Sequence, residues 1–231
     1  MKLKFTLIKL AFFFLFAAFS VAAFAQAQSL PGPSDATTAP PTSAGSVAKV
    51  LCATNTISLK SGQTVNPNYT YQWFKTNTSG TRILVKETVG NDTYTETPSG
   101  DGYYTYQLVV LNGNGCPSPA SNDIKLYVLP PLNPTIAGAG VVCEQNKTST
   151  DLTITGLDSR FTYTYQWTRN NTAITAANGG TANHYVVKES ASGTVTYGVT
   201  VNYVLNNSCS GSATKTITVD TLPAQPTIVV N

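Results

Sequence analysis

The stretch Tyr-Thr-Tyr-Gln-Trp occurs twice in this sequence, at residues 69–73 and again at residues 163–167. Successive side chains of a β-strand point to opposite faces, so Tyr69, Tyr71 and Trp73 share one face while the threonine and glutamine share the other. Aromatic side chains on one face can either fill an interior or stack on a ligand. The face with the tryptophan is predicted to point inward, because the reverse would bury threonine and glutamine and expose three rings. We therefore expect mainly core, with the first tyrosine of each copy reaching solvent.

The same spacing relates other landmarks along the chain. Pro-Thr opens each copy, at Pro41, Pro134 and Pro226, with separations of 93 and 92 residues. One tryptophan and two cysteines fall within each of the two full copies. A period this long indicates duplicated domains rather than solenoid repeats. We expect domains at residues 41–129 and 134–222, a linker at 130–133, and the start of a third copy at 223–231.

Hydrophobic residues alternate with a period of two within each copy. The alternating runs are short and are separated by clusters of Gly, Asn, Pro and Ser, which is typical of strands joined by turns. No stretch after the leader has the period of an amphipathic helix. The predicted fold class is all-β, with two tandem β-sandwich domains. The predicted core residues are Tyr71, Trp73, Tyr104, Tyr106, Tyr165, Trp167 and Tyr197.

Residues 1–25 have the pattern of a secretory signal peptide. Three lysines precede an apolar run at residues 10–25, and a small-x-small motif ends at Ala25. Cleavage is expected before Gln26, or alternatively before Gln28. An uncleaved membrane anchor is the other interpretation, although a spanning helix needs about 20 apolar residues. No later segment is long and apolar enough to span a membrane, so the mature protein is predicted to be secreted or attached to the cell surface.

Removal of the leader changes the charge balance. Three of the 14 basic residues and none of the 11 acidic residues lie in the leader, so the mature chain carries 11 of each. A protein without net positive charge has little electrostatic attraction for a phosphate backbone, and nucleic acid is therefore not an expected partner. The segment 26–40 is rich in Pro, Ser, Thr and Ala, which predicts a disordered spacer before the first domain.

Four cysteines lie in the exported part, where an oxidising environment lets disulfides persist. They allow three pairings. The duplication favours one bond inside each domain, between Cys52 and Cys116 and between Cys143 and Cys209. The alternative is that the four are free buried thiols.

Each copy resembles an immunoglobulin-like domain, in particular the cysteine-containing Ig-like repeats of large secreted surface proteins of Bacteroidota-type bacteria. The resemblance rests on the Tyr-Gln-Trp strand, the Gly-x-Tyr at residues 102–104 and the Asn-Gly-Cys at residues 114–116. It implies a β-sandwich fold and a location outside the cell. The pattern departs from antibody domains, because Tyr106 stands where their second cysteine would be. The bond in each copy is therefore expected to join the start of the domain to the hairpin that holds its second cysteine.

The sequence holds few groups for catalysis. His184 is the only histidine, and the acidic residues are scattered without the spacing of a calcium loop. We therefore expect no enzyme activity, no cofactor and no metal site. Tyr103 lies on the face opposite Tyr104 and near a loop, where an exposed ring could stack on a sugar, so it is a candidate ligand contact.

These features predict a noncatalytic spacer or adhesion module of a secreted or cell-surface protein. The alternative is an accessory region of an exported polysaccharide-degrading enzyme that binds glycan or positions a catalytic domain. Glycans and surface or matrix proteins are the candidate partners, and the sequence leaves the oligomeric state open. Because the third copy stops after one strand, we expect the sequence to be the N-terminal part of a longer protein.

Overall fold

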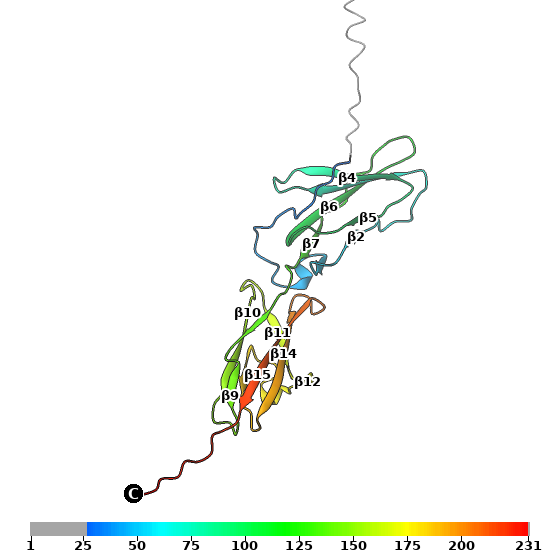
Figure 1. Ribbon diagram of the computed structural model, residues 1–231. Coiled ribbons are helices and arrows are strands. Elements are labelled where there is room, and N and C mark those ends of the chain that lie inside the picture. Colours follow the sequence, from blue (N-terminus) through cyan, green and yellow to red (C-terminus); the bar gives the residue numbers. More distant parts are fainter. Residues whose placement is uncertain (1–26, 231) are drawn as a thin grey trace, which may run out of the picture.

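The computed structural model describes residues 27–230 and consists of two β-sandwich domains arranged end to end (Figure 1). The predicted signal peptide at residues 1–25 and the last residue, Asn231, lie outside the described residues. The C-terminal segment leaves the second domain at the end that is far from the first domain (Figure 1). The predicted fold class, two tandem Ig-like β-sandwiches, is confirmed.

The first domain has a five-stranded sheet in the order β1-β7-β6-β3-β4, facing a two-stranded sheet of β2 and β5. Strands β7, β6, β3 and β4 pair antiparallel with one another, whereas β1 runs parallel to β7. A short 3-10 turn, η1 (Ala44–Ser46), precedes the first strand. The strands are β1 (Lys49–Leu51), β2 (Ile57–Leu59), β3 (Thr70–Thr76), β4 (Arg82–Val89), β5 (Tyr94–Glu96), β6 (Gly102–Leu111) and β7 (Ile124–Val128).

The second domain repeats this plan. Its larger sheet has the order β12-β11-β14-β15-β9, with β9 parallel to β15, and its smaller sheet has the order β13-β10-β8. The elements are β8 (Thr135–Ala137), β9 (Val141–Cys143), β10 (Thr150–Thr155), β11 (Tyr163–Arg169), β12 (Thr172–Ala173), η2 (Ala176–Asn178), β13 (His184–Val187), β14 (Gly193–Tyr203) and β15 (Ser210–Asp220).

Both copies of the Tyr-Gln-Trp strand lie at the centre of a sandwich. In β3 the side chains alternate between buried and half-buried, and Trp73 is on the buried side. Its indole Nε1 donates a hydrogen bond to the carbonyl of Asp92 at 3.1 Å. Trp167 in β11 is also buried and donates in the same way to the carbonyl of Ala182 at 2.9 Å. A buried indole needs such a partner, so the tryptophans fix the position of the neighbouring loop as well as the core.

The predicted core residues are found in the interior. Six of the seven are buried, and the seventh, Tyr165, is half-buried and packs against the core of the second domain. Tyr69 is 36% exposed, as expected for the first tyrosine of the stretch. Its counterpart Tyr163 does not reach solvent freely, because it packs against a separate cluster between the domains.

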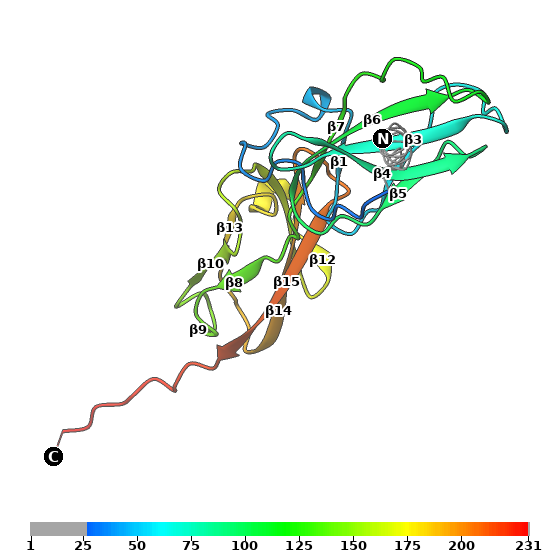
Figure 2. The ribbon, with the colours of Figure 1, turned by 90° about the horizontal axis from the view of Figure 1, so that it is seen from above.

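The segment before the first domain was predicted to be a disordered spacer, and for residues 27–40 this prediction is wrong. The backbone N–H of Gln28 donates to the carbonyl of Leu84 in β4 at 2.8 Å, and the Ser34 hydroxyl donates to the carbonyl of Thr76 at 2.6 Å. Figure 2 shows this segment in blue beside the first domain. These hydrogen bonds hold the segment against the sandwich despite its low apolar content.

Candidate functional site

The only disulfide among the described residues joins the two domains. It links Cys52, just after β1, to Cys209 in the hairpin between β14 and β15, with a Cα–Cα distance of 5.3 Å. Cys116 and Cys143 are unpaired, the first exposed and the second half-buried. The predicted bonds inside each domain are therefore wrong.

Strand direction explains this correction. The end of β1 lies beside the end of β7 and the beginning of β6, because Leu51 pairs with Val128 and Val128 pairs with Gly102. Strand β6 then carries the chain to the other end of the sandwich before it reaches Cys116. Ten residues of strand span roughly 30 Å, whereas a disulfide requires Cα atoms within about 7 Å. The two cysteines of one domain thus lie at opposite ends of it, and each can meet only a cysteine beyond its own domain.

An aromatic cluster surrounds this disulfide and forms the junction between the domains. Tyr127 of the first domain contacts Phe161 of the second with ring centroids 6.4 Å apart, and Phe161 meets Tyr203 edge-on at 5.1 Å. All three rings are buried, as is Leu129, which directly precedes the linker. The junction therefore has an apolar interior of its own, continuous from one domain to the other.

Polar contacts also cross the junction. The Asn206 side chain donates to the carbonyl of Val50 at 2.9 Å, and the Tyr203 hydroxyl donates to the carbonyl of Pro130 at 3.1 Å. Arg160 lies 3.6 Å from Asp101 of the first domain at the exposed rim. An exposed ion pair of this kind contributes little, whereas the two hydrogen bonds to backbone carbonyls fix the orientation of the domains.

Tyr103 was a candidate ligand contact, and its position contradicts that role. Its ring is 7% exposed and meets Tyr127 edge-on at 4.8 Å, and Lys125 lies over it at 4.2 Å. The backbone of Tyr103 pairs with Asp35, and its hydroxyl donates to the carbonyl of Ala39. The N-terminal segment therefore covers the ring that the sequence placed on an open face.

A buried ion cluster lies in the core of the first domain. The Lys75 Nζ is 2.5 Å from Glu96 Oε1 and donates to the carbonyl of Leu30 at 2.7 Å. The other carboxylate oxygen accepts hydrogen bonds from the hydroxyls of Tyr94 at 2.7 Å and Tyr106 at 2.9 Å. Burial lowers the pKa of Lys75 and raises the pKa of both tyrosines, so the hydroxyls remain protonated donors.

The second domain contains the same cluster in the same register. Lys75 pairs with Tyr106 in the sheet of the first domain, as Arg169 pairs with Tyr197 in the second. Arg169 binds Glu189 through two hydrogen bonds of 3.0 and 2.8 Å, and the Tyr197 hydroxyl donates to the same carboxylate. A cation, a glutamate and a tyrosine thus meet in both domains, although Lys75 is fully buried whereas the Arg169 side chain is 47% exposed.

Sequence reasoning missed these clusters, although a signal was present. A basic residue stands two positions after each tryptophan, and side chains two apart in a strand share a face. Because the tryptophan face was predicted to point inward, both basic side chains start on the inner face; Lys75 is fully buried there, whereas the Arg169 side chain reaches outward and is 47% exposed. A buried cation needs a carboxylate, so the first domain had to bring one acid close to Lys75.

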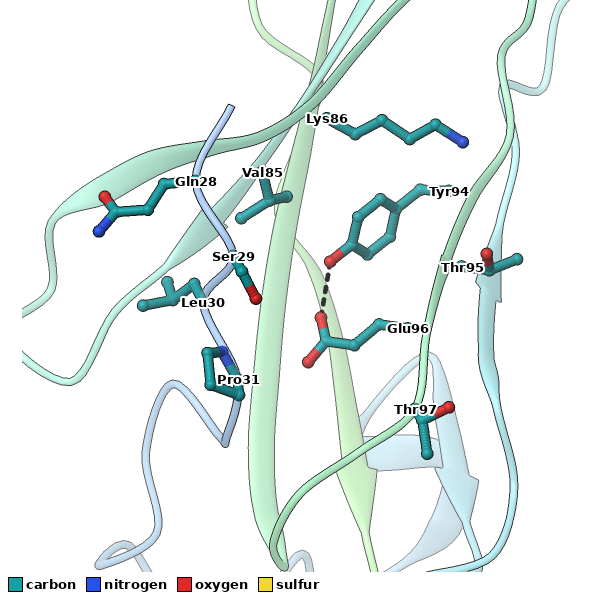
Figure 3. Close-up of a pocket in the computed structure, with 10 residues that line it drawn as sticks. All are labelled: Gln28, Ser29, Leu30, Pro31, Val85, Lys86, Tyr94, Thr95, Glu96 and Thr97. Atoms are coloured by element: carbon teal, nitrogen blue, oxygen red, sulfur yellow. Dashed lines mark hydrogen bonds between the residues drawn. The ribbon is translucent and has the colours of Figure 1, made fainter. Parts of the chain in front are cut away.

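Figure 3 shows a pocket of about 420 Å³ between the N-terminal segment and strands β4 and β5. Leu30 and Pro31 line one side, Tyr94 and Glu96 line the other side, and Val85 lies between the two sides in this view. Both oxygens of Glu96 already accept hydrogen bonds within the domain. The carboxylate in this pocket is therefore committed to holding the core together, and the other charged lining residue, Lys86, donates to the carbonyl of Thr93 at 2.9 Å.

His184, the only histidine, lies at the start of β13, where its ring is exposed and its Nδ1 is 3.0 Å from the Asn183 side chain. Within residues 27–230, no cluster of three or more His, Cys, Asp or Glu side chains could hold a metal ion. Within the same range, no helix is long and apolar enough to cross a membrane.

The stability of the second domain should depend on pH through Glu189. Its hydrogen bonds with Arg169 lower the pKa of this carboxyl below the ordinary 4.5, against the opposing effect of burial. A carboxyl with a lowered folded-state pKa stabilises the fold above its unfolded pKa, and this stabilisation is lost as the pH falls through the folded-state value. We expect the free energy of unfolding of the second domain to decrease below about pH 4.5, and Glu189→Gln to flatten this dependence. Urea unfolding at several pH values measures it, and an unchanged slope in the variant would contradict it.

No family model matches this sequence, and no curated protein is similar to it in sequence. Several solved structures share the general fold at low similarity. A putative membrane anchored protein from Corynebacterium diphtheriae is 12% identical, with 73% of this chain and 48% of that chain covered and a TM-score of 0.33. The FN1–FN3 domains of chicken CNTN1 are 15% identical, with 83% and 67% covered and a TM-score of 0.33.

A third structure is SGBP-B of the Bacteroides ovatus mixed-linkage glucan utilization locus, in complex with a mixed-linkage heptasaccharide. It is 12% identical, with 84% of this chain and 46% of that chain covered, and the TM-score is 0.27. The chain thus spans about half the length of the Corynebacterium and Bacteroides proteins that it matches.

Proposed function

We propose that this chain is a noncatalytic Ig-like repeat protein of the cell exterior that acts as a stiff spacer or adhesion module. The observation that carries the proposal is the junction, where a disulfide, a buried aromatic cluster and two hydrogen bonds fix one domain on the other. A spacer has to keep its two ends apart, and a rigid junction between domains does so.

Bending at the junction would separate the rings that meet there. Full burial of one phenylalanine contributes about 1.5–3 kcal/mol, and the cluster contains Tyr127, Phe161 and Tyr203 together. Two prolines in the linker, Pro130 and Pro131, further restrict the backbone. Two domains connected in this way are expected to move as one body, unlike most domain pairs with small interfaces.

Two further observations support a location outside the cytoplasm and a role without catalysis. A structural disulfide persists in oxidising compartments, and the Cys52–Cys209 bond requires one. The buried acids Glu96 and Glu189 are each bound by a basic residue and a tyrosine, so their charges serve the fold.

The rigidity can be measured by ¹⁵N relaxation of the oxidised protein. A stiff rod tumbles as one anisotropic body, so amides of both domains should fit a single rotational diffusion tensor. The Phe161→Ala variant with the disulfide reduced should give two shorter, separate correlation times. The matched control is Val89→Ala, an exposed position on β4 away from the junction. Independent tumbling of the domains in the oxidised native protein would refute the proposal, and a glycan-array screen of the same sample tests the accessory-region alternative.

A further inference from the structure

The two unpaired cysteines occupy the same positions as the two bonded ones. Cys143 ends β9, which runs parallel to β15, just as Cys52 follows β1, which runs parallel to β7. In the hairpins, the carbonyl of Cys116 accepts a hydrogen bond from the backbone of Asn112, as the carbonyl of Cys209 does from the backbone of Tyr203. Each unpaired thiol is therefore the equivalent of one partner in the existing disulfide.

These thiols lie at opposite ends of the two-domain rod. Strand β6 leads away from the junction to the hairpin that holds Cys116, and β9 ends with Cys143 beside the last residues of β15. In Figure 1 β9 lies at the lower end of the second domain, where the chain leaves. One end of the rod thus carries Cys116, the equivalent of Cys209, and the other end carries Cys143, the equivalent of Cys52.

Apolar residues next to the thiols point to the same contact. Val50 is 6% exposed at the junction, whereas its equivalent Val141, before Cys143, is 53% exposed. Tyr163 packs into the junction, whereas its equivalent Tyr69, at the other end, is 36% exposed. Each end therefore has an exposed apolar residue, Val141 or Tyr69, whose equivalent at the junction packs against the other domain.

We propose that Cys143 of one copy of this chain bonds to Cys116 of a second copy, repeating the Cys52–Cys209 linkage head to tail. Asn112 stands where the junction has Tyr203. The noncovalent contact is consequently weaker than at the junction, and the disulfide holds it together. A contact between two different surfaces that does not close on itself produces open chains of copies rather than dimers.

The chemistry requires a disulfide oxidant such as oxidised glutathione. The Cys143 thiolate attacks one sulfur of the oxidant, forming a mixed disulfide and releasing one reduced glutathione. The Cys116 thiolate of the second copy then attacks the Cys143 sulfur and releases the second reduced glutathione. Two protein thiols are oxidised to one disulfide, the oxidant is reduced to two glutathione thiols, and the two protons lost by the protein thiols are taken up by the two released glutathione thiolates.

The test uses the protein with its Cys52–Cys209 bond formed, incubated at increasing concentration in a glutathione redox buffer. Nonreducing gels should show a ladder of dimers, trimers and longer chains that a reductant removes. Mass spectrometry of peptides should find Cys116–Cys143 links in at least about tenfold excess over either symmetric link, which corresponds to about 1.4 kcal/mol of preference for the head-to-tail contact.

Two variants make the test specific. Cys116→Ser alone and Cys143→Ser alone should each remain monomeric, while an equimolar mixture of the two should form one species, a dimer. Symmetric dimers of either variant, pairing of the native thiols in random proportions, or a native protein that stays monomeric would each overturn the proposal. Thermal unfolding of each variant confirms that it is folded. The outcome is independent of the spacer role, because a rod that never links to another copy can still tumble as a single rigid body.

Discussion

Glu96→Ala is expected to lower the free energy of unfolding of the first domain by about 3–5 kcal/mol, because it leaves a buried cation without its counterion. The Lys75 side chain is fully buried, and its ammonium has Glu96 Oε1 and the carbonyl of Leu30 as partners. The substitution also removes the acceptor for the hydroxyls of Tyr94 and Tyr106. The loss of stability should therefore affect both sheets of the first domain, because Lys75 and Tyr106 belong to the larger sheet and Tyr94 belongs to the smaller one.

Urea unfolding combined with hydrogen exchange of peptides from β3 and β6 measures this loss in the first domain. The matched control is Glu87→Ala on the neighbouring strand, since Glu87 contacts only Gln72 at the surface and should change stability by less than about 0.5 kcal/mol. The double variant Lys75→Met with Glu96→Leu should recover part of the loss, because an apolar pair needs no counterion. Equal effects of Glu96→Ala and Glu87→Ala would show that the buried pair does not stabilise the fold.

Strand patterns in the sequence predicted the sandwich and its aromatic core correctly because period-two alternation reports directly on burial. Trp73 and Trp167 are buried as that pattern requires. The same alternation also placed Lys75 and Arg169 on the tryptophan face, where Lys75 is buried and Arg169 remains 47% exposed. It could not show which acid meets each cation, because Glu96 and Glu189 reach them from another strand and from a loop, at separations that no local pattern encodes.

Disulfide pairing was harder to predict because it depends on the ends of strands rather than on the order of residues. The duplication showed that Cys52 is equivalent to Cys143 and that Cys116 is equivalent to Cys209. That equivalence is satisfied equally by one bond inside each copy and by one bond between consecutive copies. Only the direction of β6, which places Cys116 far from Cys52, selects the second arrangement.

The N-terminal segment shows that amino-acid composition alone does not decide whether a segment is ordered. Its residues contribute little apolar area, and composition alone predicts disorder for such a segment. The segment is ordered by specific polar contacts with the sandwich, among them the carbonyl of Leu30 on Lys75 and the pairing of Asp35 with Tyr103. These contacts also remove Tyr103 from the surface, so the wrong prediction for the spacer and the wrong prediction for the ligand contact have one physical cause.

Replacement of Cys52 and Cys209 by serine is expected to remove up to about 5 kcal/mol of stability and to uncouple the domains. The disulfide closes a loop with a sequence separation of 157 residues. In the chain-entropy model, a crosslink of this length restricts the unfolded chain by an amount equivalent to about 5 kcal/mol. The junction cluster would remain, but only the linker and noncovalent contacts would then connect the two domains.

Denaturant unfolding of the oxidised protein and of this double variant can be followed by tryptophan fluorescence, to which both domains contribute because each contains one tryptophan. The native protein should unfold with closely coupled transitions, and the variant should show two transitions, each at lower denaturant concentration. Cys116→Ser with Cys143→Ser is the matched control, because it removes the same number of thiols without breaking a bond. If the Cys52 and Cys209 variant unfolded like this control, the disulfide would not contribute to the junction, and the stiffness of the rod would have to come from the aromatic cluster and linker alone.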